Sequence, residues 1–418
     1  MSTSSKLRRP RPPDKLAVLS KLRQFKSRGA VVRGRRPTRP QRRGTIVVLS
    51  AFLMVAMIAM VAFSVDVGAL YVARTELQRA ADSGALAAAA EMLESSLQGG
   101  DWGGEQDRQV RNTARQFVEL NFIGRQSPTI DINTEQKEDG DLLFGEVANW
   151  DAARRTFQTS GAGEYNAVQV RVSRSDRING EVPLFFAKIF GMRTSEVEAR
   201  ATAAFVTRMR GFRSPGNGRE NLPLLPIAIS EETLDEMLRG DGPDAYSWDN
   251  DTQSVTTKRD GRHEADLFPE RSGAAGNWGL VDVGSAKSSP GTLQQQIRNG
   301  LTPAELDYHG GEIALDFQGE LTLSGNPGLK IGVIEPALQS IVGQPRIVPV
   351  YSSASGGGTN AQYTITGFAG VCVVSVQLKS GNKSLRIQAC PVITRGGIPA
   401  EGSQQTSKYI YSPVALVN

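Results

Sequence analysis

An uninterrupted apolar run of 21 residues, from Thr45 to Val65 (TIVVLSAFLMVAMIAMVAFSV), constrains this chain more than any other feature. As a helix with a rise of about 1.5 Å per residue, the run is roughly 32 Å long, which matches a hydrocarbon core of about 30 Å. A helix satisfies its own backbone hydrogen bonds, so it is the natural structure for such a run in lipid. The run therefore predicts one transmembrane anchor, bounded by Thr45 and Val65.

The charges on the two sides of this run differ sharply. Residues 1–43 contain 15 Lys or Arg and one acid, a net charge of +14, whereas residues 44–418 contain 33 basic and 42 acidic residues, a net charge of −9. The positive-inside rule therefore places the tail in the cytoplasm, with Arg42 and Arg43 as the topology-determining pair, and the rest outside. A cleaved signal peptide is the alternative, but its apolar region is typically only about 7–15 residues long.

The basic tail admits two interpretations. A nucleic-acid-binding arm is one, but Phe25 is the only aromatic residue among the cationic ones. The other is a topology signal that also attracts anionic lipid headgroups, at roughly 1 kcal/mol per basic residue near the surface. We favour the second, and so expect the lipid bilayer as a partner and no nucleic acid.

The sequence after Asp66 contains strong helix formers and no proline, which predicts one unbroken helix from the membrane to about Leu97. Small residues on a helix face let another helix or sheet approach closely. One such face contains Leu77, Ala81, Gly84, Ala88 and Met92. Either this face covers the protein's own domain, or it is an assembly surface. We carry it forward as a candidate assembly face.

Several short motifs follow one another in a fixed order around the anchor. They are Arg42-Arg43-Gly44 before it, Asp66-Val67-Gly68 and Tyr71 after it, and then Arg74 to Gln78 (RTELQ), Ala80-Ala81-Asp82 and the alanine run Ala87 to Ala90. In this order the block Arg42 to Ala90 resembles the N-terminal module of TadG-like Flp (tight adherence) pilus-assembly proteins. A looser likeness extends over Val182 to Phe205.

The resemblance implies a bacterial inner-membrane protein with one span, a cytoplasmic N-terminus and a periplasmic bulk, whose partners are other pilus-assembly or secretion proteins. Some relatives carry a von Willebrand factor A domain, whose metal site needs an Asp-x-Ser-x-Ser pentad. This sequence has none, so metal-dependent adhesion is not expected. A type IV prepilin is also disfavoured, because Leu49 occupies the position where pilins place a glutamate.

Residue periodicity predicts the remaining organisation. A helix at 105–123, alternating strands at 168–172 and 197–205, and a short helix at 184–190 suggest a small α+β domain over 105–208. An Arg-, Gly- and Asn-rich stretch predicts a linker at 209–221. A β-rich domain is expected over 222–418, with strands at 346–350, 363–368, 371–378 and 385–389 and helices at 231–238 and 292–298.

The predicted fold class is therefore a single N-terminal transmembrane α-helix continuing into a long extracytoplasmic helix, then α+β and β-rich extracytoplasmic domains. Its segments are the tail 1–43, the anchor and continuing helix 44–97, the α+β domain 105–208, the linker 209–221 and the β-rich domain 222–418.

The two cysteines, Cys372 and Cys390, are a candidate disulfide. A hairpin turn at Gly381-Asn382, with Leu378 opposite Leu385 and Val376 opposite Ile387, gives the register that hydrophobicity prefers. That register puts the two cysteines on different faces. A disulfide therefore requires a bulge between the turn and the cysteines, and the sequence leaves the question open.

No established catalytic motif occurs. His263 and His309 are the only histidines, which excludes a multi-histidine metal centre. The acid-rich stretches at 241–251 and 260–266 lack the pattern of an EF-hand loop and suggest solvated loops. Ser380 to Lys383 matches Ser-x-x-Lys but falls in a predicted turn. We predict no enzyme, no catalytic, cofactor-binding or metal site, and no small-molecule substrate. A membrane-tethered module that binds an extracytoplasmic ligand or surface, without a pilus role, is the alternative function.

Overall fold

The computed structural model describes residues 45–97, 102–147, 150, 155–159, 165–249, 251–268, 279–284, 289–326, 331–357, 360–379, 383–400 and 406–417. The basic tail, Arg42 and Arg43, and the predicted turn at Gly381-Asn382 lie outside these residues. The chain divides into two compact units, residues 1–59 and residues 60–418.

The first half of the fold contains α1 (Thr45–Leu97), α2 (Gly104–Glu119), β1 (Leu142–Val147), β2 (Phe157–Gln158), β3 (Ala167–Arg174), β4 (Val182–Pro183), the 3₁₀ helix η1 (Ala187–Phe190), β5 (Thr194–Ser195) and β6 (Val197–Ala204). The second contains β7 (Met209–Arg213), α3 (Pro215–Gly218), β8 (Ile229–Ser230), α4 (Glu231–Arg239), β9 (Ser247–Asp249), β10 (Ser254–Thr256), β11 (Glu264–Phe268), α5 (Pro290–Asn299), α6 (Pro303–Leu306), η2 (Asp307–His309), β12 (Glu312–Ala314), β13 (Leu321–Ser324), η3 (Ile331–Val333), α7 (Glu335–Gln339), β14 (Pro345–Ser355), β15 (Gln362–Gln377), β16 (Ser384–Ala389), β17 (Val392–Ile393), β18 (Gly397–Pro399), β19 (Ser407–Lys408), β20 (Ile410–Tyr411) and β21 (Ala415–Leu416).

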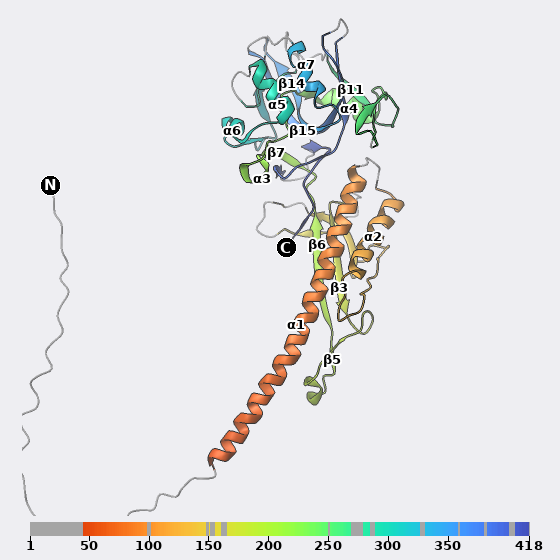
Figure 1. Cartoon of the computed structure of the whole chain (residues 1–418), viewed down its shortest axis with the longest axis vertical. Helices are drawn as coiled ribbons and strands as arrows, with labels where there is room; N and C mark the ends of the chain where they lie inside the picture. Colours follow the sequence, from red (N-terminus) through yellow and green to blue (C-terminus); the bar gives the residue numbers. More distant parts are fainter. Residues whose placement is uncertain are drawn as a thin grey trace, which may run out of the picture. The chain divides into compact units, whose positions relative to one another are not determined.

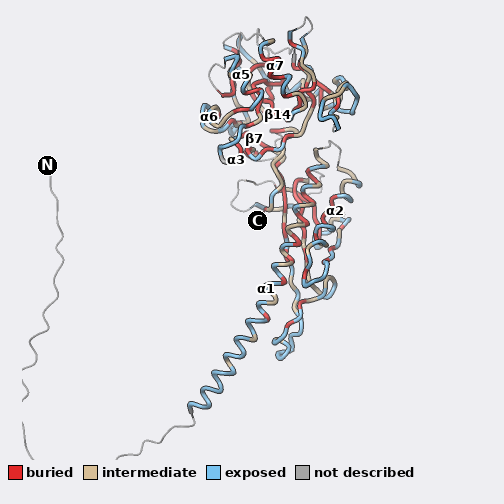
Figure 2. Tube along the Cα trace, in the orientation of Figure 1, coloured by how far each residue is buried: buried red, intermediate tan, exposed pale blue. Residues whose placement is uncertain are grey.

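Helix α1 is continuous over 53 residues, which confirms the predicted helix to Leu97 (Figure 1). The uncharged apolar run therefore ends at Val65, but the helix does not. The large apolar side chains between Ile46 and Val65 are 45–72% exposed, whereas many of those after Ala73 are buried (Figure 2). By length and composition alone, α1 is the one helix among the described residues that qualifies as a membrane span.

The later part of α1 and helix α2 pack on the sheet β2-β1-β3-β6-β21, and we call this assembly the N-terminal module. Strands β3 and β6 pair antiparallel over eight residues, from Ala167 opposite Ala204 to Arg174 opposite Val197. Alternate residues of these strands, such as Val170 and Ala201, face the helices and are buried. The alternation in sequence thus placed both strands correctly. The 44–97 helix and the predicted 105–208 domain share one core.

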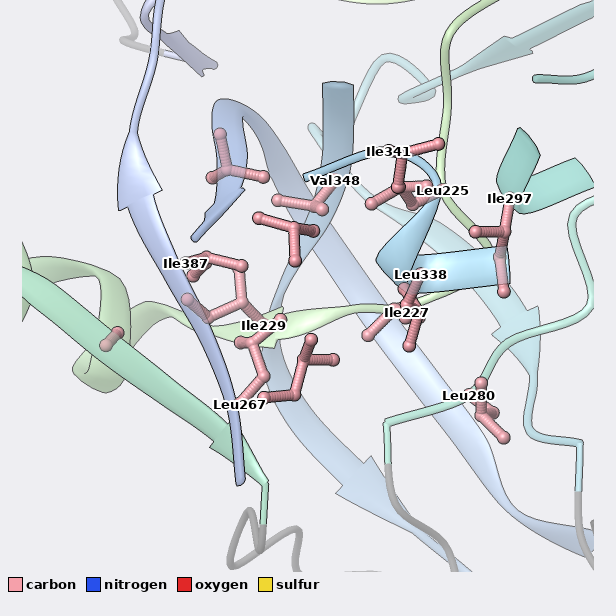
Figure 3. Close-up of a cluster of buried hydrophobic side chains, with 14 of the residues drawn as sticks. Leu225, Ile227, Ile229, Leu267, Leu280, Ile297, Leu338, Ile341, Val348 and Ile387 are labelled. Carbon is pink, nitrogen blue, oxygen red and sulfur yellow. The ribbon is translucent and has the colours of Figure 1, made fainter. Parts of the chain in front are cut away.

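The β-rich module contains β7 to β20. Its largest sheet has the order β11-β16-β15-β14-β8, with β13 and β19 also pairing with β15. Helices α4, α5 and α7 contribute to the core cluster in Figure 3, where Ile297 and Leu338 meet sheet residues such as Val348 and Ile387. The two strands predicted at 363–368 and 371–378 are in fact one strand, β15, which has 16 residues.

The linker predicted at 209–221 needs correction. Residues 209–213 form β7, the central strand of the three-stranded sheet β12-β7-β18, and Phe212 is fully buried against Phe368. Gly211, read as a linker residue, allows β12 to approach, since a Cβ there would lie 2.3 Å from the Cα of Ala314. Residue 211 must therefore be glycine because β12 packs closely against β7 at this point.

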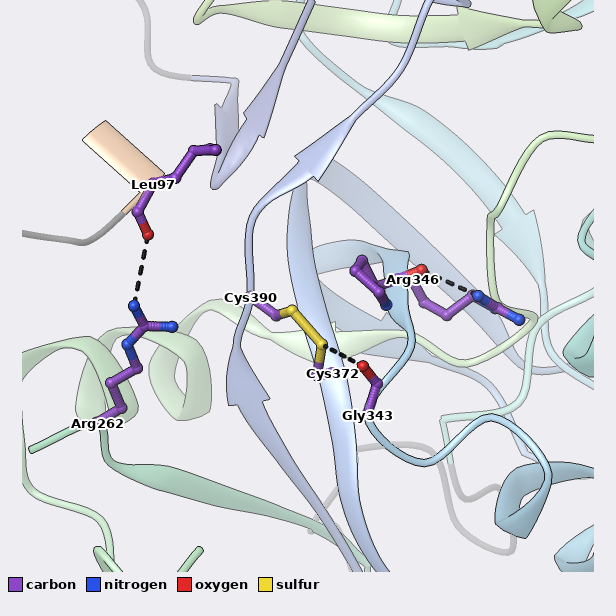
Figure 4. Close-up of a disulfide and its surroundings, with 7 residues drawn as sticks. Leu97, Arg262, Gly343, Arg346, Cys372 and Cys390 are labelled. Atoms are coloured by element: carbon purple, nitrogen blue, oxygen red, sulfur yellow. Dashed lines mark hydrogen bonds between the residues drawn. A yellow bond between two sulfur atoms is a disulfide. The ribbon is translucent and has the colours of Figure 1, made fainter. Parts of the chain in front are cut away.

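Cys372 and Cys390 form a disulfide, with Cα atoms 5.3 Å apart (Figure 4). The predicted register is wrong, because Leu385 pairs with Val376 and Ile387 pairs with Val373. A register shift between Val373 and Ser375 supplies the bulge that the disulfide was expected to require. Cys372 pairs with Gln388, two residues before Cys390, so the bulge leaves the two cysteines diagonal to each other on the same face.

Candidate functional site

The candidate assembly face on α1 is not a free surface. Leu77, Ala81, Ala88 and Met92 have no exposed surface, and Gly84 is also buried. All lie on the core side of α1, against α2 and the inner face of the sheet. The prediction of an assembly face is therefore corrected. The small residues let α1 cover its own sheet, which is the other interpretation that the periodicity allowed.

Gly84 sets the closest approach of α1 and α2. A Cβ at this position would lie 2.5 Å from Cγ2 of Val118 and 3.2 Å from the carbonyl oxygen of Ala114. Both atoms belong to α2, so any side chain at residue 84 would push the two helices apart. Gly68, on the same helix, has open space around it.

Arg111 locks α2 to the segment before β1. Its side chain is 1% exposed, its guanidinium pairs with Asp107 at 2.6 Å, and it donates to the carbonyl oxygens of Ile132 and Asn133 at 2.7 and 2.8 Å. The guanidinium carbon also lies 4.2 Å from the centre of the Phe144 ring. These donors satisfy carbonyl groups that no regular secondary structure would satisfy.

Asp66 is the first charged residue after the apolar run, and it is buried. Its carboxylate accepts hydrogen bonds from the backbone N–H groups of Phe185 at 2.6 Å, Phe186 at 3.0 Å and Ala187 at 2.7 Å. These groups belong to residues 184–193, which connect β4 to β5 and which we call the β4–β5 tip. Asp66 thus caps the start of η1 and fixes the tip to α1.

The electrostatics of this contact favour the ionised carboxylate. Burial alone raises the pKa of Asp66. The three N–H donors and the positive charge of Lys188 outweigh burial and hold the pKa of this carboxyl below its ordinary value. A carboxylate that accepts several backbone N–H bonds therefore stays charged at neutral pH.

We expect Asp66→Ala to release the tip from α1. Because the pKa of the folded state is depressed, the contact contributes fully above the ordinary Asp pKa of about 3.9 and is lost as pH falls through the folded value. The protection factors of the Phe186 and Ala187 amides, taken relative to the intrinsic exchange rate at each pH, should therefore be high at neutral pH, low in Asp66→Ala and low in the wild type once Asp66 is protonated. Asp176→Ala, in an exposed turn, is the matched control and should leave these amides protected.

Three more motif residues of α1 also make contacts within the N-terminal module. Glu76 accepts from the N–H of Gly124 at 2.9 Å. Gln78 donates to the Asp82 carboxylate at 2.8 Å and to the carbonyl oxygen of Arg200 at 3.0 Å. Glu76 and Gln78, which belong to the recognised motifs, thus connect α1 to the rest of its own module by hydrogen bonds.

Two family models match this part of the chain. One, described as Flp pilus-assembly TadE/G-like, covers residues 44–91, and the other, described as Tad-like Flp pilus-assembly, covers residues 78–203. Residues 44–203 of the chain thus match models of the Tad-type Flp pilus-assembly family. Searches of curated proteins and of solved structures find no match.

Together the two matches cover the N-terminal module from α1 to β6 and leave out its strand β21. The first covers nearly all of α1, and the second runs from Gln78 through β6. Both include the buried face of α1 around Gly84, and the first includes Asp66. The family pattern therefore describes one folded unit, and it supports a role in pilus assembly.

Acidic side chains in the stretch 260–266 make contacts within the β-rich module. Glu264 accepts from the N–H groups of Ala245 and Tyr246 at 3.0 and 2.9 Å, and Asp266 pairs with Arg386 at 3.0 Å. His263 Nδ1 lies 2.7 Å from the carbonyl oxygen of Gly242. Within the described ranges, no group of three or more His, Cys, Asp or Glu side chains is arranged to hold a metal ion.

Sequence reasoning recognised Asp66 as a motif residue but missed its role. Its partners lie about 120 positions further along the chain. The available signal was the charge itself, because an aspartate that directly follows a long apolar run needs hydrogen-bond donors if it is buried. Arg111 gave no signal beyond its place on α2.

Proposed function

We propose that this protein is a single-pass component of the bacterial inner membrane that helps to assemble a Flp pilus and performs no catalysis. Residues 45–65 span the bilayer, the tail lies in the cytoplasm and the remainder is periplasmic. Its partners are the lipid bilayer and other pilus-assembly or secretion proteins. The observation that carries the proposal is the continuity of α1 from an exposed apolar stretch into the core of the N-terminal module.

This continuity has a mechanical meaning for an assembly protein. A flexible linker would let the periplasmic part drift, whereas an unbroken helix joins the anchor to the module without such a linker. Helix α1 extends 32 residues beyond Val65, about 48 Å at 1.5 Å per residue. The family matches supply the pilus context, and the apolar run supplies the anchor.

Deleting the gene should abolish surface Flp pili, counted by electron microscopy, and reduce adherence to a surface. A plasmid copy of the wild type should restore both. Unchanged piliation in the deletion strain would contradict the pilus role. It would favour the alternative of a tethered module that binds another ligand.

Topology is tested separately in spheroplasts. Added protease should digest the β-rich module and leave an epitope tag at the N-terminus intact. Protection of both ends would contradict the proposed orientation, whatever the outcome for pili.

A further inference from the structure

The β4–β5 tip exposes an unusual cluster of large apolar side chains. Phe185 is 63% exposed, Ile189 80%, Phe190 81% and Met192 58%, and Phe186 is also exposed (Figure 2). Leu184, at the base of the tip, is buried instead. Exposed apolar clusters of this kind mark contact with a membrane or with another protein.

The position of the tip on α1 decides between these two occupants. Its backbone is fixed to Asp66, which directly follows the last apolar residue of the span. The exposed side chains of Phe63 and Val65 belong to the turn of α1 that precedes Asp66, so the residue that holds the tip directly follows an apolar surface. Tyr71, five residues beyond Asp66 on α1, is 73% exposed, and tyrosine is enriched at membrane interfaces.

The charges of the tip fit the same surface. Lys188 and Arg193 are the only charged residues in 184–193, and both are exposed cations. Anionic phospholipids attract such residues, whose long side chains reach the headgroups while the apolar neighbours enter the acyl region.

We propose that the β4–β5 tip is a second membrane contact, which inserts into the periplasmic leaflet beside the anchor. The insertion is shallow, about 5–10 Å, as for other interfacial segments. Asp66 holds the tip at this depth. The span and the tip together fix the rotation of the module about the α1 axis, which one helix alone leaves free. The inference rests on the proposed anchoring of α1.

The test places a single fluorophore on the full-length protein. Both native cysteines are in a disulfide, so Ile189→Cys offers one free thiol for an environment-sensitive dye. The protein is reconstituted in vesicles of phosphatidylethanolamine with a minor fraction of phosphatidylglycerol. Nitroxide-labelled lipids should then reduce the emission of the dye to about half or less, as for a side chain at the acyl boundary.

Two further positions keep the outcomes distinct. Phe317→Cys, 94% exposed in the β-rich module, should be quenched by aqueous iodide and not by the lipids. Ile58→Cys reports the anchor itself. If the dye at residue 58 is quenched by lipid and the dye at residue 189 only by iodide, the anchor stands and the tip proposal is overturned.

A dye at residue 189 that is shielded from both quenchers would show that a protein covers the tip, which also overturns the proposal. If lipid quenches neither position 58 nor 189, the anchoring itself fails.

Discussion

Gly84→Leu is expected to destabilise the N-terminal module by about 1–2 kcal/mol. Overpacking a well-filled core costs about 1–3 kcal/mol or more, and the first added carbon already lies 2.5 Å from Val118. The helix propensity gained by replacing glycine, about 1 kcal/mol, offsets only part of this cost. Hydrogen exchange of the β3 amides, followed in increasing urea, measures the free energy of opening of this module.

Gly68→Leu is the matched control for this variant. It makes the same chemical change on the same helix, at a position with no neighbouring atom within 4 Å. It should leave β3 exchange unchanged or slower. Equal effects of the two substitutions would show that helix α1 does not pack against α2 in the way described.

Arg111→Met should cost about 1–3 kcal/mol, because it leaves hydrogen-bond acceptors without their donors. The methionine fills much of the same volume over Phe144, so lost packing is a minor part of the effect. The acceptors are the carbonyl oxygens of the half-buried Ile132 and the buried Asn133, whereas the Asp107 side chain is 27% exposed and keeps its access to solvent. The measurement is the same urea series, read at the amides of α2 and β1.

Arg108→Met provides the comparison within α2. The Arg108 side chain is 70% exposed and its nearest acid, Glu105, lies 3.6 Å away, so the change should be within about 0.5 kcal/mol. If Arg111→Met behaved like this exposed control, the buried guanidinium would not hold the segment before β1.

The sequence predicted those elements whose pattern is local. Helix α1 follows from the absence of proline, and strands β3 and β6 follow from strict alternation over eight residues each. In each case neighbouring residues alone decide the hydrogen-bond partner or the buried face. The buried side of α1 was also readable, but not what covers it, because small residues suit either neighbour.

Two of the errors lie at glycines. Gly370 lies in the gap between the strands predicted at 363–368 and 371–378, yet it belongs to β15, where a Cβ would come 2.3 Å from the carbonyl oxygen of Tyr409. Gly211 lies in the Arg-, Gly- and Asn-rich stretch that predicted a linker. Local sequence cannot distinguish a glycine that the backbone conformation needs from one that a distant neighbour needs.

The remaining gaps concern partners far apart in the chain. The contact of Asp66 with the β4–β5 tip joins residues about 120 positions apart. Strand β21 has only two residues, Ala415 and Leu416, and carries no strand pattern of its own. Such pairings depend on the assembled fold, which residue periodicity does not encode.

The pairing of β21 with β6 has a consequence for how this protein bears load. Leu416 pairs with Ala203, so the chain leaves the first sheet through β6 and returns to it at the end. The β-rich module is therefore topologically an insertion into the N-terminal module. The chain connects it to the first sheet twice, through β6 before it and β21 after it. A growing pilus that pulls on this module would stretch two attachments in parallel. The first sheet also gains strand β21 only after the ribosome has synthesised the β-rich module.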